Sequence, residues 1–252
     1  MTVTEAEIAE HRALLQEILR MANGDLLALY QLVQMQDPDV QANWLLDGVP
    51  EIVAAYRAAA VDVGSVFYAE TQGLKLERDM AAAAAAVNTG VLEQSLRWAI
   101  FAADPAGIIG RLAGVVQRHV VDGSRETGML TAAATKQAWV RAAHPGACQF
   151  CRLLATRGLD GVGGFTSKET ATFTGMSARG VRKAKKGHSR QEKGDKFHDN
   201  CMCVPVLAEA YTPPDYVLEW ERDYFDALDE LGTATDQYAV LAQMRKTSGH
   251  NH

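Results

Sequence analysis

All four cysteines of this 252-residue chain lie in two short segments. The first segment is a C-x-x-C made by Cys148 and Cys151, and the second is an H-x-x-C-x-C made by His198, Cys201 and Cys203. The two thiolates of a C-x-x-C sit on one turn at the spacing of zinc ligands, and a second pair from a distant segment can complete a tetrahedron. The pattern therefore predicts that two distant stretches of the chain are tied together at one zinc site of structural type.

The second segment offers one ligand more than the tetrahedron needs, so two ligand sets are open. In the first set, Cys148 and Cys151 bind the metal together with His198 and one of the other two cysteines. In the second set, all four cysteines bind and the histidine hydrogen-bonds to a ligand. Either set would stabilise the fold because it closes a long connection. The alternatives are cysteines that are buried or disulfide-bonded, and thiol redox chemistry, for which no redox-fold context stands out.

The composition is that of an ordinary soluble protein. The chain is 48% hydrophobic and 22% charged, with a net charge of -6, and is long enough to bury a core without disulfide staples. It has no run of eighteen apolar residues, and its first residues lack the features of a secretory signal. We therefore expect a cytosolic protein without membrane contact. In a reducing cytosol, clustered cysteines serve as metal ligands or redox groups more often than they form disulfides.

Residues 1–134 show the apolar periodicity of helices. Thr4 and Glu7 match a capping box directly before the first periodic stretch. The prolines at Pro38 and Pro50 predict breaks that open a second and a third helical segment. We therefore expect a helical N-terminal region over residues 1–134.

The composition changes after Thr135. Residues 137–143 and 202–207 are predicted to form short strands, so the cysteines would follow one strand and precede the other. Residues 135–210 are expected to form a small α+β module, and helical periodicity returns in a C-terminal arm over residues 211–252. The predicted fold class is α+β, predominantly α.

A basic segment runs from Lys168 to Lys196 in an otherwise acidic protein. It holds nine Lys and Arg residues against three acidic ones. Such a segment can contact DNA phosphates or an acidic protein surface without base specificity, and no aromatic residue lies between Val181 and Lys196 to stack on bases. The alternative is a solvated loop. The candidate contact residues are Arg179, Arg182, Lys183, Lys185, Lys186 and Arg190.

An aromatic stripe lies in the predicted C-terminal arm. Tyr216, Trp220 and Tyr224 recur at every fourth position, which places them on one face of a helix. A wide aromatic face is what a helix uses to dock in a groove of a partner protein. The stripe is therefore a candidate partner-docking site, and packing within the chain is the alternative.

The residues of the predicted module resemble a known family. The stretches that carry the resemblance are Trp139–Arg141, Cys148–Gly158 and Phe197–Val206. In order and composition they resemble the phage Mu F-like minor head proteins, in the form found in tailed phages of actinobacteria. The motif resemblance covers roughly residues 135–210, and the helical flanks agree in general layout only.

The resemblance implies a head-morphogenesis protein with a structural role. Such a protein is made in the host cytoplasm and ends in the virion interior, where it associates with the portal protein, the major capsid protein, or both, and contacts packaged DNA without specificity. The resemblance also implies a metal-binding role for the residues of the two cysteine segments, namely Cys148, Cys151, His198, Cys201 and Cys203.

Two enzymatic functions are alternatives, and we favour the structural role over both. A capsid maturation protease needs a nucleophile and a base, yet no nucleophile signature surrounds any of the serines (Ser167, Ser177, Ser189) or the histidines near the module (His144, His188, His198). An ADP-ribosyltransferase-like enzyme is suggested by Phe165-Thr166-Ser167 and Glu219-Trp220-Glu221, but these glutamates fall on a predicted amphipathic helix.

Overall fold

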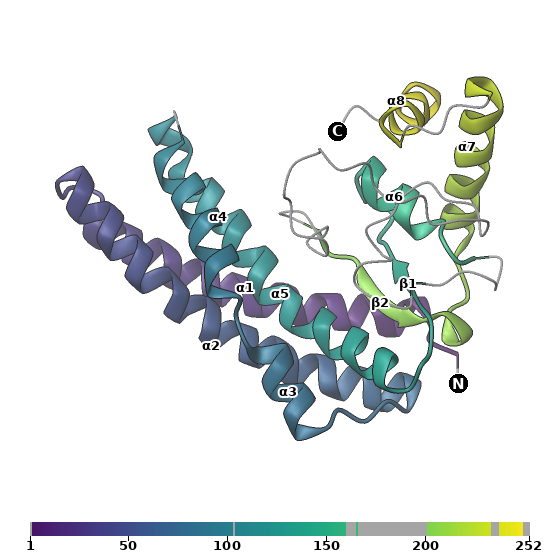
Figure 1. Cartoon of the computed structure of the whole chain (residues 1–252), viewed down its shortest axis with the longest axis horizontal. Helices are drawn as coiled ribbons and strands as arrows, with labels where there is room; N and C mark the ends of the chain where they lie inside the picture. Colours follow the sequence, from purple (N-terminus) through teal and green to yellow (C-terminus); the bar gives the residue numbers. More distant parts are fainter. Residues whose placement is uncertain (1, 103, 160–164, 166–200, 233–236, 249–252) are drawn as a thin grey trace. The chain divides into compact units, whose positions relative to one another are not determined.

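The computed structural model describes most of the chain and divides it into two compact units (Figure 1). The described residues are 2–102, 104–159, 165, 201–232 and 237–248. We call residues 9–131 the helical unit, and the described residues of 2–8 and 132–248 the mixed unit. Each unit is treated by itself below.

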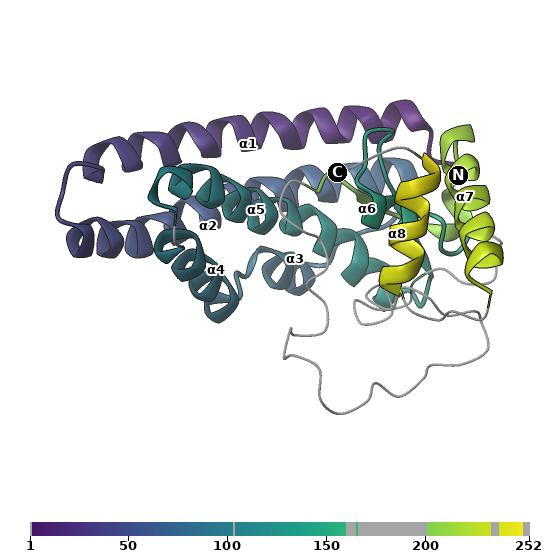
Figure 2. The same cartoon turned by 90° about the horizontal axis from the view of Figure 1, so that it is seen from above.

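The helical unit is built from five α-helices, seen from two directions in Figures 1 and 2. Its helices are α1 (Glu5–Val33), α2 (Pro38–Gln72), α3 (Arg78–Ala85), α4 (Thr89–Phe101) and α5 (Ile108–Ala134), with a 3-10 turn at Pro105–Gly107 before α5. Helices α1 and α2 form a long hairpin, and α4 packs on α2. The predicted helical N-terminal region is observed.

The first helix begins at the predicted capping box. The Thr4 backbone N–H donates to Glu7 Oε2 at 2.7 Å, and the Glu7 backbone N–H donates to Thr4 Oγ1 at 3.2 Å. This reciprocal pair satisfies two donors that no helical carbonyl can reach. The start of α1 is therefore set by local residues.

The predicted break at Pro50 is wrong, because α2 runs through this proline without interruption. A proline inside a helix lacks a donor and crowds the preceding turn, at a cost of about 3 kcal/mol. The side chains of Leu45, Val49 and Val53 lie on the same face of α2 and are fully buried. Their burial offsets the cost, because each buried aliphatic side chain contributes about 2 kcal/mol.

Helix α2 is long and apolar enough to cross a membrane by length and composition alone. Core helices meet the same criterion, and α2 carries a buried cation, Arg57, that is 3% exposed. Its guanidinium donates to the carbonyl oxygens of Ala84 and His119, each at 2.8 Å, and pairs with Glu126 at 2.9 Å. These contacts tie α2 to α3 and α5, as expected of a helix in a protein core.

The mixed unit contains a two-stranded antiparallel sheet and three helices. Strand β1 (Trp139–Ala142) pairs with β2 (Val204–Leu207), with Ala142 opposite Val204. The helices are α6 (Gln149–Ala155), α7 (Asp215–Leu231) and α8 (Gln237–Ser248), with a 3-10 turn at Ala208–Ala210 after β2. Both predicted strands are present, and the fold class is α+β, predominantly α, as predicted.

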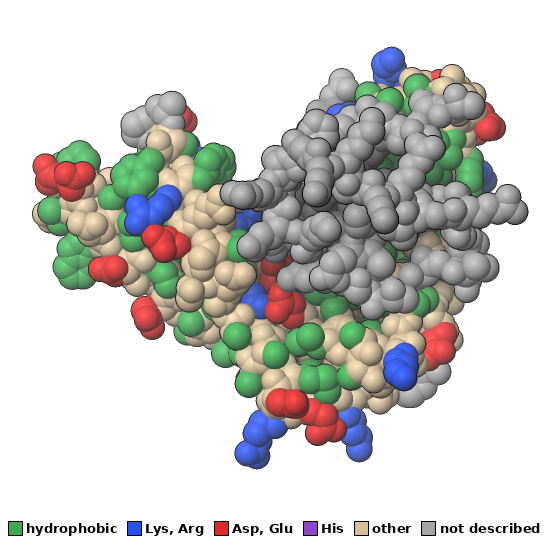
Figure 3. All heavy atoms as spheres, in the orientation of Figure 1, with side chains coloured by type: hydrophobic (Ala, Val, Ile, Leu, Met, Phe, Trp, Pro, Cys, Tyr) green, Lys and Arg blue, Asp and Glu red, His purple; other side chains and the backbone are tan. Residues whose placement is uncertain are grey.

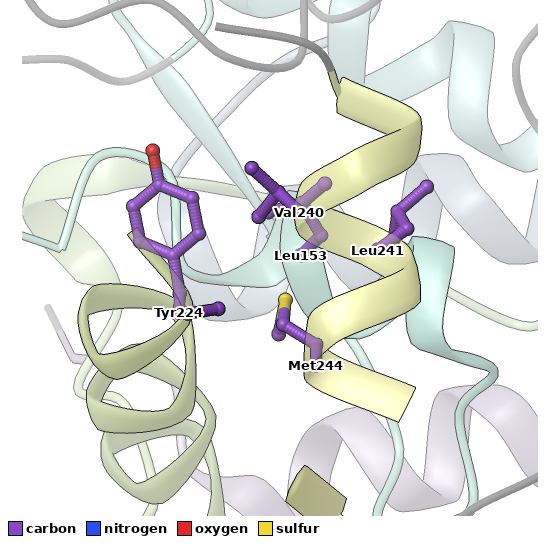
Figure 4. Packing of buried hydrophobic residues seen from close by; sticks show 6 residues of the cluster. Leu153, Tyr224, Val240, Leu241 and Met244 are labelled. Carbon is purple, nitrogen blue, oxygen red and sulfur yellow. The ribbon is translucent and has the colours of Figure 1, made fainter. Parts of the chain in front are cut away.

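The predicted C-terminal arm is part of the mixed unit and packs on its module. Figure 4 shows Leu153 of α6 between Tyr224 of α7 and a group of side chains from α8. The buried cluster consists of Leu153, Tyr224, Ala227, Val240, Leu241 and Met244. The short helix α6 cannot bury its own apolar face, so the three helices cover one another.

Candidate metal centre

The sheet register brings the two cysteine segments together. Cys148 is the sixth residue after β1 and occupies the N-cap position of α6, and Cys151 lies in the first turn of that helix. The other two, Cys201 and Cys203, immediately precede β2. Because Ala142 pairs with Val204, the end of β1 lies beside the start of β2, and the cysteines gather at this edge.

Three of the cysteines form a compact buried cluster. The Sγ atoms of Cys151, Cys201 and Cys203 all lie within 4.8 Å of one another, and those of Cys151 and Cys201 are 3.5 Å apart. All three side chains are at most 3% exposed. Thiolates bound at 2.3 Å to the corners of a tetrahedron lie about 3.8 Å apart, so the cluster could hold a metal ion. None of the four cysteines forms a disulfide.

The fourth cysteine lies at the margin of this cluster. Cys148 is half-buried, and its side chain interacts by hydrogen bonding with that of Cys151. Its sulfur is not within 4.8 Å of all three others, and His198 lies outside the residues that the structure describes. The described ligands are thus three thiols in one group and a fourth beside them.

Mutual hydrogen bonding and burial favour the protonated form of two of these thiols, Cys151 and Cys203, when no cation is bound. Hydrogen bonds with Cys148 and the other two cysteines, followed by burial, raise the pKa of Cys151 far above that of an ordinary thiol. The pKa of Cys203 is raised to about 12: a hydrogen bond with Cys151 lowers it, but interactions with Cys201 and burial outweigh this. A divalent metal would have to displace these protons, so metal affinity should rise with pH.

Two buried arginines flank the cysteines. Arg141 of β1 is 1% exposed and acts electrostatically on Cys203, whose pKa it lowers. Arg152 follows Cys151 in α6, is 6% exposed, and interacts electrostatically with Asp223 of α7 and, more weakly, with Cys148. Buried cations are stabilised by nearby anions, so both arginines favour thiolates at this site.

The sequence of the chain matches the profile of one protein family over most of its length. The sequence profile of the VG15 protein family matches residues 2–227. The chain belongs to the VG15 family. The VG15 match includes the helical unit, the sheet, both cysteine segments and most of α7, and it ends before α8. No curated protein and no solved structure is significantly similar to the chain. VG15 is a viral or phage gene family, so the match suggests a phage protein, and the resemblance to minor head proteins stays a prediction.

The aromatic stripe of this VG15 protein faces inward along α7. Trp220 and Tyr224 are 6% and 8% exposed, and the guanidinium carbon of Arg152 lies 5.0 Å from the centre of the Trp220 ring. The Tyr216 hydroxyl donates to the Ala143 carbonyl oxygen at 3.0 Å. Packing within the chain therefore accounts for these side chains. Docking through them stays a prediction and would require α7 to separate from α6.

The candidate enzymatic residues that the structure describes lie in the connection from β1 to α6, in a bridge to β1 and on α7. His144 lies in a turn, where its Nδ1 accepts from the Gly146 backbone N–H at 3.1 Å. Glu219 and Glu221 lie on α7, as predicted for an amphipathic helix. Phe165 is described and forms an isolated antiparallel bridge with Trp139. The other candidates lie outside the described residues, and so do all the candidate residues of the basic segment: Thr166, Ser167, Ser177, Ser189, His188, His198, Arg179, Arg182, Lys183, Lys185, Lys186 and Arg190.

Sequence reasoning assigned no role to Arg141 and Arg152, although both belong to the stretches that resemble the minor head proteins. A usable signal was present in each case. Arg141 interrupts an otherwise apolar predicted strand, and Arg152 directly follows the C-x-x-C. A charged residue that stands in a buried strand or beside a thiolate pair indicates a buried counter-charge.

Proposed function

We propose that this VG15 protein is a minor head protein of a tailed phage. It is made in the host cytoplasm and enters the virion interior, where it associates with the portal protein or the major capsid protein and contacts packaged DNA through its basic segment. The observation that carries the proposal is the convergence of both cysteine segments at one sheet edge, in the region whose motifs resemble the minor head proteins. The VG15 match over residues 2–227 supports the coarser part of the proposal, a virion-related phage protein.

The metal of the centre is zinc, and its role is structural. Soft, buried thiolates on a short helix and beside a strand suit Zn²⁺, which takes four sulfur or nitrogen ligands in closed structural sites. Cys151, Cys201 and Cys203 are three of the ligands. Zinc bound there stabilises the mixed unit by joining α6 to the segment that leads into β2, because the bond energy is available only in the folded state.

Cys148 is the fourth ligand that the described residues offer. Its side chain hydrogen-bonds with that of Cys151, one of the three clustered thiols. Four thiolates with one Zn²⁺ carry two net negative charges. Arg141 and Arg152 are buried beside these sulfurs and stabilise negative charge there, although Arg152 also interacts with Asp223.

The head role is tested by co-expressing the full chain with the portal protein of the same phage genome. Size-exclusion chromatography and peptide quantification of the portal peak should show stoichiometric co-elution. Clean separation from the portal protein would contradict portal association. The same experiment with the major capsid protein then tests contact with the shell, and failure of both would remove the proposed role.

A further inference from the structure

One end of the helical unit exposes a group of large apolar side chains. Leu32 and Met35, at the end of α1 and in the turn that follows it, are 76% and 89% exposed, and Trp44 of α2 is 59% exposed. Trp98 and Phe101, near the C-terminal end of α4, are 56% and 61% exposed. The α1–α2 turn and this end of α4 lie at the same end of the helical unit in both Figures 1 and 2. We call these five residues the end surface.

The end surface is an organised part of the fold. Asp37 caps α2 by accepting from the Asp39 backbone N–H at 3.0 Å, and Pro38 follows the cap as the first helical residue. Farther along the hairpin, α1 and α2 approach so closely that a Cβ placed on Gly48 would lie 2.8 Å from a methyl group of Leu29. The backbone of the hairpin that carries Leu32, Met35 and Trp44 is therefore held in place before binding, which lowers the entropy cost of docking.

The tip of the hairpin, which carries most of the end surface, has acidic but no basic residues. From residue 21 to residue 56 the chain has no Lys, Arg or His, and it has five carboxylates: Asp25, Asp37, Asp39, Asp47 and Glu51. Trp44, Asp47 and Glu51 follow one another along a single exposed face of α2. At the α4 end, the cation Arg97 is paired with Glu93 at 2.8 Å. Figure 3 shows hydrophobic side chains interspersed with acidic and some basic ones at this end of the unit.

The acidic rim decides which kind of partner fits. DNA and anionic lipid surfaces would be repelled by it. A symmetric contact between two copies through this end would place like charges against each other, because both copies present the same patch. A protein surface with an apolar groove and a basic rim is complementary in both respects.

We propose that the end surface is a docking site for a protein partner that presents an apolar groove flanked by Lys and Arg. Trp44 and Met35 are its anchors, since exposed tryptophan and methionine side chains on a rigid frame supply the buried centre of such contacts. Asp47 and Glu51 pair with the basic rim of the partner and speed association. This site does not depend on the role proposed above.

The test uses the purified full chain and two fluorescent synthetic peptides that fold as amphipathic helices. Both peptides have a leucine face, and the opposite face is lysine in one and glutamate in the other. Fluorescence anisotropy should show binding of the lysine peptide only. The double variant Met35→Ser/Trp44→Ser should bind it at least about tenfold more weakly, and Asp47→Asn/Glu51→Gln should weaken binding most at low salt.

The control is Leu14→Ser/Val66→Ser, which removes two exposed apolar side chains, 51% and 56% exposed, from α1 and α2 outside the end surface. This control should bind as the wild type does, and circular dichroism should show that all variants keep their helical content. Equal binding of the glutamate peptide, or undiminished binding by Met35→Ser/Trp44→Ser, would overturn the proposal. Light scattering supplies a further outcome. If the wild type is a dimer and Met35→Ser/Trp44→Ser is a monomer, the end surface binds a second copy of the chain, and the proposal is overturned.

Discussion

The Sγ atoms of Cys151 and Cys201 lie 3.5 Å apart, although 50 positions separate them in the sequence. The antiparallel pairing of β1 and β2 brings them together, and Cys203 completes a cluster within 4.8 Å. Three buried thiols at this spacing are compatible with one tetrahedral metal ion.

Protein purified without chelator should contain about one zinc per chain. Cys151→Ser or Cys201→Ser should lose this zinc and lower the melting temperature, because an incomplete site binds far more weakly and the bond energy contributes to folding. Elemental analysis and thermal unfolding measure both effects, and added chelator should reproduce them in the wild type. Metal-free wild-type protein, or thiol titration that finds a disulfide, would contradict the prediction.

The fourth ligand can be identified by replacing zinc with cobalt, whose visible spectrum depends on the number of sulfur ligands. If Cys148 is the ligand, Cys148→Ser should change the spectrum and His198→Asn should leave it unaltered. The opposite result would show that the histidine binds. Arg152→Met should leave the number of sulfur ligands unaltered but weaken cobalt affinity, since it removes one buried positive charge beside the site.

The buried cation Arg57 should be essential for the stability of the helical unit. Arg57→Met removes its bonds to the carbonyl oxygens of Ala84 and His119 and its pair with Glu126, so we expect a loss of about 3 kcal/mol. Urea unfolding followed by circular dichroism measures the change. Arg20→Met is the control, because Arg20 is an exposed arginine paired with Glu17, and it should cost less than about 1 kcal/mol. Similar losses in both variants would refute the role of burial.

His11 should make the protein less stable in mild acid. Its ring is 2% exposed, is stacked on Phe67 with ring centres 4.2 Å apart, and has Nε2 2.9 Å from Ser124 Oγ. Burial, and then the nearby charge of Arg12, lower its pKa from 6.5 to about 4. Below pH 6.5 the unfolded chain therefore binds a proton that the folded chain does not bind until about pH 4.

The free energy of unfolding should accordingly fall as the pH drops through this window, by up to about 3 kcal/mol from this group, and His11 should contribute no slope above pH 7. Urea unfolding between pH 7 and pH 4 measures the slope. The variant His11→Gln cannot take up the proton, so its pH dependence should be flatter by this amount. An identical slope in the variant would assign the acid sensitivity to other groups.

Local sequence signals account for much of the fold. The capping box of Thr4 and Glu7, the periodic apolar residues of the helical region, and the two short strands were predictable because each depends on neighbours within a few positions. The cysteine spacing likewise predicted a metal site, since ligand types and separations are themselves local.

Tertiary packing decided the rest. Pro50 stays inside α2 because the side chains of Leu45, Val49 and Val53 are buried. The free energy gained by this burial cannot be predicted from the residues next to Pro50. The aromatic stripe of α7 turned inward because α6 needed an apolar cover, although an exposed stripe would have the same sequence. The pairing of β1 with β2 determined which thiols meet, and the arrangement of the helices left Met35 and Trp44 exposed. Burial and long-range pairing depend on contacts between distant residues, so they become defined only when the whole chain has folded.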